Sequence, residues 1–130
     1  MQKRFLLLSL ALMLTGGTAM AKGGHHKHAA ASNHYVISIK KMAFKPHNLV
    51  VPAGATIVVK NLGSDTHSVT SQAKRNDHVP GGVNGVSFDT GEFTGKKEIS
   101  IPATAQAGTV IPYYCSVHGK DMKDGQITIK

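Results

Sequence analysis

The stretch LVVPAGATIVVK, residues 49–60, contains two short β-branched runs separated by a turn sequence. Valine and isoleucine favour extended backbone because their branched side chains pack well on a pleated sheet. The tripeptide Pro52–Gly54 lies between the runs, and proline and glycine this close together are typical of a turn. The stretch therefore predicts one strand at Leu49–Val51 and a second at Ala55–Lys60.

Similar signals recur along the rest of the chain. Tyr35, Ile37 and Ile39 alternate with other residues, which predicts a strand with one buried face. Residues 72–97 are rich in glycine and polar residues and predict a loop, with one short strand at Val86–Phe88. No helical period is found beyond the first 21 residues. The sequence thus predicts an all-β sandwich of seven to eight strands, the others being His67–Ser71, Lys97–Ile101, Val110–Tyr114 and Gln126–Ile129.

The first part of the chain has the pattern of an export signal. Lys3 and Arg4 precede an apolar run of about ten residues, and Ala19–Ala21 offers the small residues that precede a cleavage point. A helix that spans a bilayer needs about 20 apolar residues, so stable membrane insertion is not expected. The sequence predicts a signal peptide at residues 1–21, a flexible His-rich tail at 22–33, a folded domain at 34–130 and export to the periplasm.

The exported chain is basic. The full chain has 15 Lys and Arg and 7 Asp and Glu; removal of Lys3 and Arg4 with the signal leaves 13 against 7, a formal charge of +6. A positive balance favours acidic partners through long-range attraction. Nucleic acid is not expected as a partner, because the lysines are scattered and form no basic stripe with stacking aromatic residues.

The only cysteine lies in the segment YYCSVHGKDM, residues 113–122. An exported cysteine normally forms a disulfide, but Cys115 has no partner within the chain. His118 and Met122 follow it closely, and a thiolate, an imidazole and a thioether are soft ligands that select copper. A blue-copper site needs a second histidine, and His67 is the best placed, at the start of a predicted strand. His47 and His78 are expected at the surface, although His78 is an alternative ligand if its loop folds over the site.

Several motifs resemble those of the cupredoxins, the small blue-copper proteins of the plastocyanin, pseudoazurin and amicyanin group. FKPHNLVVPAGATIVVKN matches the family segment F-x-P-x-x-L-x-V-x-x-G-x-T, and THSVT, FDTG and YYCSVHGKDM follow in the family's order. The resemblance covers about residues 35–130. It implies a Greek-key β-sandwich that binds one copper ion, with His67, Cys115, His118 and Met122 as ligands and His118 nearest the surface.

Two positions depart from the family pattern. Family members often have asparagine directly after the first histidine, where it ties the ligand loops together, whereas this chain has Ser68. We expect that link to be weaker, or to be made with Ser116. The spacing C-x-x-H-x-x-x-M lies between the shorter and longer loops of the group, so the axial distance, the reduction potential and the colour are left open.

The function expected from this set is that of a monomeric one-electron carrier, not an enzyme, which shuttles electrons between redox proteins such as cytochromes or oxidase domains. A thiol nucleophile with a histidine base would leave Met122 and His67 without a role. Two alternatives stay open. One is a copper-binding module for delivery or storage, in which the N-terminal histidines collect the metal; these are His25, His26, His28 and His34. The other is an interaction domain that binds no metal.

Overall fold

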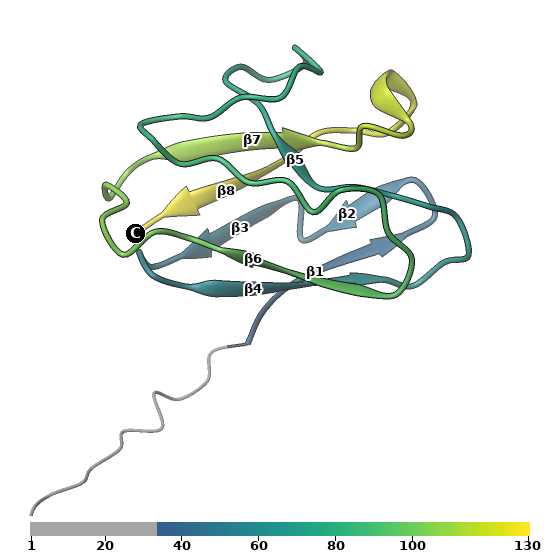
Figure 1. Ribbon diagram of the computed structural model, residues 1–130, viewed down its shortest axis with the longest axis horizontal. Helices are drawn as coiled ribbons and strands as arrows, with labels where there is room; N and C mark the ends of the chain where they lie inside the picture. Colours follow the sequence, from purple (N-terminus) through teal and green to yellow (C-terminus); the bar gives the residue numbers. More distant parts are fainter. Residues whose placement is uncertain (1–33) are drawn as a thin grey trace, which may run out of the picture. The chain divides into compact units, whose positions relative to one another are not determined.

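The computed structural model describes residues 34–130, which form two four-stranded sheets (Figure 1). The predicted signal peptide and His-rich tail lie outside the described residues. Within residues 34–130, no helix has the length and apolar character needed to cross a membrane. The expectation of an all-β sandwich of seven to eight strands is confirmed, with eight strands in the part of the chain that the structure describes.

The first sheet has the strand order β2-β1-β4-β6. The central pair, β1 and β4, is parallel, with Ile37 opposite Val59, and the two outer pairs are antiparallel. Ile37 and Ile39 of β1 are fully buried, as the alternation in the sequence predicts. The bounds of the strands are β1 Tyr35–Lys40, β2 Ala43–Lys45, β4 Thr56–Asn61 and β6 Lys96–Ser100.

The second sheet has the order β3-β8-β7-β5, with β3 and β8 parallel. Its inner face contributes Val51, Ile111, Ile127 and Ile129, all essentially without solvent exposure. Full burial of one such side chain contributes about 1.5–3 kcal/mol, so this core between the sheets is the main source of stability. The strands are β3 Asn48–Val51, β5 Thr70–Ser71, β7 Val110–Tyr114 and β8 Gly125–Ile129.

The turn at Pro52–Gly54 carries the chain from one sheet to the other, because β3 and β4 belong to different sheets (Figure 1). Gly54 has a φ of 79°, in the left-handed region that glycine adopts without strain. The Gly54 amide donates to the carbonyl of Pro102, which fixes the corner against a second turn. The two runs that flank Pro52–Gly54 therefore form a corner of the sandwich.

Two predicted strands differ from the structure. The strand expected at His67–Ser71 is reduced to Thr70–Ser71, because the Ser68 amide donates to Cys115 Sγ instead of to a neighbouring strand. Val86–Phe88 forms no strand; the Phe88 amide donates to the hydroxyl of Ser71, and only isolated bridges surround it. Strand β2 and the short 3₁₀ turn η1 at Gly119–Asp121 were not expected from the sequence.

Gly125 begins β8 where the ring of Tyr113 lies against the backbone. A Cβ atom added at Gly125 would overlap ring atoms of Tyr113, which is fully buried and packs edge-on against Phe44 at 4.8 Å. Because the ring is enclosed by the core and Gly125 is paired with Tyr113 in the sheet, an added Cβ would overpack the interior.

We predict that Gly125→Ala lowers the free energy of unfolding of the copper-free protein by about 1–3 kcal/mol or more, measured by urea denaturation. Gly63→Ala is the matched control, because a Cβ there meets only ordinary contacts at 3.7 Å or more and the site is exposed. The control should change stability by less than about 0.5 kcal/mol. Equal effects of the two substitutions would contradict the close packing of Tyr113 on Gly125.

Candidate metal centre

Three of the four predicted ligands come together at one end of the sandwich. His67 lies between β4 and β5, Cys115 directly follows β7, and His118 caps η1. The Nδ1 atoms of His67 and His118 lie 3.8 Å and 3.5 Å from Cys115 Sγ, and the donor atoms of all three residues lie within 4.8 Å of one another. Two segments far apart in the sequence thus supply one compact set of donors.

The separations in this triad suit a metal ion. For bonds of about 2.1 Å to nitrogen and 2.3 Å to sulfur at trigonal angles, sulfur and nitrogen would lie about 3.8 Å apart. The observed 3.5 Å and 3.8 Å are close to this value. One thiolate with two imidazoles is the donor set of trigonal copper sites. The residues present therefore fit a copper ion without a large rearrangement.

The donors differ in their access to solvent. Cys115 and His67 are essentially buried, whereas His118 is half-buried. Burial lowers the pKa of His67, the nearby His118 lowers it further, and Asp65 acts in the opposite direction. A lowered pKa favours the neutral imidazole, which has the free lone pair that a metal needs.

The fourth predicted ligand, Met122, is buried at 1% exposure and belongs to the same apolar core as Cys115. Backbone hydrogen bonds fold the segment back on itself: the Gly119 amide donates to Cys115 O at 2.8 Å, and the Met122 amide to Gly119 O. This tight turn places His118 beside Cys115 and returns Met122 to the interior. Its role as an axial ligand stays a prediction.

The sequence matches the profile of the cupredoxin-like domain family over residues 6–129. The chain belongs to this family. Among solved structures, a reduced Cu(I) amicyanin variant is 19% identical to this chain, with a TM-score of 0.58. The match covers 75% of this chain and 83% of the amicyanin chain. Amicyanin from Paracoccus versutus is 20% identical, with a TM-score of 0.55 and coverage of 75% and 82%. A purple cupredoxin from Nitrosopumilus maritimus is 22% identical, with a TM-score of 0.53 and coverage of 74% and 99%. No curated protein matches the chain.

In this cupredoxin, the loop that carries His67 is held at both ends. The side-chain amide of Asn61 donates to Asp65 O at 2.7 Å and accepts from the Gly63 amide at 3.0 Å. His67 and Phe93 exchange two backbone hydrogen bonds, of 3.1 Å and 2.9 Å. The imidazole of His67 is therefore positioned by the backbone before any metal binds.

Ser68 joins the His67 loop to the Cys115 loop, as the sequence led us to expect. Ser68 Oγ lies 2.8 Å from Ser116 Oγ and accepts from the Ser116 amide, also at 2.8 Å. The Ser68 amide in turn donates to Cys115 Sγ at 3.4 Å. One serine thus replaces the asparagine common in the family, with Ser116 as its partner.

The hydrogen bonds of Ser68 continue to the surface through two residues that the sequence did not single out. Thr70 Oγ1 donates to Asp89 Oδ1 at 3.0 Å and lies 3.0 Å from Ser68 Oγ. Each hydroxyl has one proton, so with that of Thr70 given to Asp89, Ser68 donates to Thr70 and Ser116 donates to Ser68. Asp89 lies within the FDTG motif, which is the one sequence signal that could have pointed to it.

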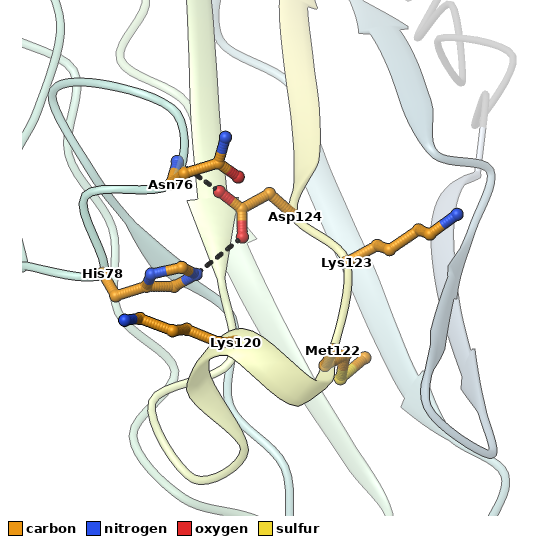
Figure 2. Close-up of a pocket in the computed structure, with 6 residues that line it drawn as sticks. All are labelled: Asn76, His78, Lys120, Met122, Lys123 and Asp124. Atoms are coloured by element: carbon orange, nitrogen blue, oxygen red, sulfur yellow. Dashed lines mark hydrogen bonds and ion pairs between the residues drawn. The ribbon is translucent and has the colours of Figure 1, made fainter.

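His78 does not join the donor triad. Its ring Nε2 lies 3.2 Å from Asp124 Oδ1 (Figure 2). The ring also packs edge-on against Tyr114 at 5.5 Å. Within residues 34–130, His67, Cys115 and His118 are the only group of three or more His, Cys, Asp or Glu side chains close enough together to hold a metal ion. The alternative in which His78 is a ligand is therefore not favoured.

We predict that Ser68→Ala destabilises the copper-free protein by about 1–3 kcal/mol in urea denaturation, because the Ser116 amide loses its acceptor. Ser116→Ala is the control, since its amide can still donate to Ser68 Oγ and only the exposed hydroxyl is lost. It should cost less than half as much. A larger loss from Ser116→Ala would show that Ser68 is not the link between the loops.

Proposed function

We propose that this cupredoxin is a one-electron carrier with a single copper ion held by His67, Cys115, His118 and Met122. The observation that supports this most is the preformed triad of donor atoms, one ring nitrogen from each histidine and the sulfur of Cys115, within 4.8 Å of one another. When bound, copper supplies the Cu(II)/Cu(I) couple, which trigonal His₂Cys sites with a distant methionine use for electron transfer.

The surroundings of the triad suit a carrier. Ser68, Asn61 and the turn after Cys115 hold the donors in place through hydrogen bonds, so little need move when the charge of the site changes. A site that needs no rearrangement exchanges electrons without a large structural barrier. The half-buried His118 is the one donor with solvent access, and we assign it the role of the exit for the electron.

We further propose that the protein works in the periplasm as a monomer and docks transiently with acidic redox partners, such as cytochromes or oxidase domains. The export pattern of residues 1–21 and the formal charge of +6 that remains after its removal support this. Transient redox complexes bury small interfaces, so electrostatic steering contributes mainly to the rate of association.

We predict that the copper-loaded protein has an intense visible band from charge transfer between the Cys115 thiolate and Cu(II), and that Cys115→Ser abolishes it. Serine keeps the volume but removes the thiolate that the transition requires. Absorption and EPR spectra of both proteins test this, and circular dichroism controls for folding. A mutant with the same band would exclude Cys115 as a ligand.

Irreversible voltammetry with rapid loss of copper to a chelator would favour the delivery or storage function over the carrier.

We predict that electron exchange between the copper-loaded protein and anionic hexacyanoferrate slows several-fold when ionic strength rises from about 0.01 M to about 0.1 M, because salt screens the attraction to a basic surface. Stopped-flow absorption at the charge-transfer band measures the rate. A cationic reagent such as hexaammineruthenium should show the opposite trend. Rates independent of salt for both reagents would remove the support for acidic partners.

A further inference from the structure

A buried carboxylate lies two residues beyond Met122. The side chain of Asp124 has only 2% exposure. Together with Asn76, His78, Lys120, Met122 and Lys123 it lines an open hollow (Figure 2). Burial of a carboxylate is costly unless hydrogen bonds compensate the lost hydration. A charge buried at this position therefore needs partners, and the structure shows what they are.

The hydrogen-bond partners of the Asp124 carboxylate within residues 34–130 come from one segment, residues 72–78. Oδ2 accepts from the side-chain amide of Gln72 and from the Asn76 amide at 2.7 Å, and Oδ1 lies 3.2 Å from His78 Nε2. Gln72 is also fully buried, and its Oε1 accepts from the His78 amide at 2.8 Å. Asp124 and Gln72 thus hold both ends of this segment.

The conformation of segment 72–78 depends on these bonds. It forms no strand with the rest of the sheet beyond Ser71, and two of its residues, Asn76 and His78, have φ values of 65° and 52°. Residues other than glycine adopt this left-handed region at a cost in energy. The Asp124 carboxylate compensates that cost, since it binds the Asn76 amide and the His78 ring directly.

Met122 is a neighbour of this segment. It lines the same hollow as Asn76, His78 and Asp124, and it is nevertheless only 1% exposed. In Figure 2, the Asp124 carboxylate points to Asn76 and His78, while Met122 lies below it at the end of the 3₁₀ turn. Asp124 therefore connects the chain that follows Met122 to segment 72–78, which lines the same hollow.

We propose that Asp124 is a positioning residue for Met122. Asp124 anchors segment 72–78 to the chain that follows Met122, and thereby keeps the Met122 thioether buried and fixed in the metal centre. The part that concerns the metal rests on the proposed function, in which Met122 is a ligand. The anchoring of the segment does not rest on it.

Asparagine is a weaker anchor than aspartate at position 124. The carboxylate accepts on both oxygens, from three donors in total. An amide has one oxygen and one NH₂ group. One orientation turns the NH₂ group toward the Gln72 and Asn76 donors. The other keeps these two bonds without the negative charge and turns the NH₂ group toward His78 Nε2, which accepts only in the tautomer with its proton on Nδ1. Asp124→Asn therefore keeps the shape of the side chain and weakens the anchor.

The first test uses copper-free protein and hydrogen peroxide, with mass spectrometry to follow sulfoxide formation at each methionine. We expect Met122 to be oxidised about tenfold faster in Asp124→Asn than in the wild type, because a lost hydrogen bond to a charged group favours opening of the segment by about this factor. Met42, which is half-buried outside the segment, serves as the internal reference and should not change. Asp77→Asn is the matched control, since this carboxylate is in the same segment but exposed.

Oxidation of Met122 at equal rates in the wild type and Asp124→Asn would overturn the proposal. If Asp124→Asn does not fold, the same oxidation measurement on His78→Asn tests the proposal, because asparagine tolerates the left-handed conformation but is too short to reach Asp124. Faster oxidation of Met122 in that variant supports the anchor, and an unchanged rate overturns it.

The second test uses copper-loaded protein. We expect the charge-transfer band, the EPR spectrum and the reduction potential of Asp124→Asn to shift relative to both the wild type and Asp77→Asn. A purely structural role would lower stability and leave these properties unchanged, and that result would overturn the positioning of Met122. If the wild type itself lacks the band, the proposed function fails, whereas the peroxide comparison still tests the anchor.

Discussion

The hydrogen bonds between Ser68 and Ser116 join two loops that lie 48 residues apart in the sequence, and the candidate metal centre depends on this junction. His67 precedes one end of it and Cys115 precedes the other. With the loops joined, the two Nδ1 atoms and the sulfur have suitable separations before an ion binds. The packed sheets of the sandwich thus hold the two loops near each other, and a few polar side chains align the donor atoms within them.

The strands with regular alternation or dense β-branched runs could be predicted from the sequence, because their burial follows from local pattern alone. Ile37 and Ile39 in β1 are the clearest example. The irregular backbone at residues 67–69 and 86–88 could not be predicted, since the Ser68 amide bonds to a sulfur and the Phe88 amide to a hydroxyl elsewhere in the chain. A local pattern of residues carries no information about such distant acceptors.

The residues of the candidate site can also be divided into those that the sequence could predict and those that it could not. Cys115, His118 and His67 could be selected because their side chains have the chemistry of copper ligands, and the structure brings them together. Asp124 and Asp89 have no such signature, and each is one carboxylate among several in the sequence. Their positions become informative only when the fold shows which donors surround them. Sequence reasoning therefore finds groups that touch a metal more readily than groups that hold them.

The parallel pairing of β3 with β8 has a kinetic consequence. It aligns Asn48 with Gln126, so the second sheet is complete only after segments very distant in the sequence have met. Such non-local contacts form slowly, because a long loop must close before the contact compensates the lost entropy. The segment from Cys115 to Met122 immediately precedes β8 and gains its final neighbours at that late step. We therefore expect the metal to enter an already folded apoprotein instead of acting as a nucleus for folding.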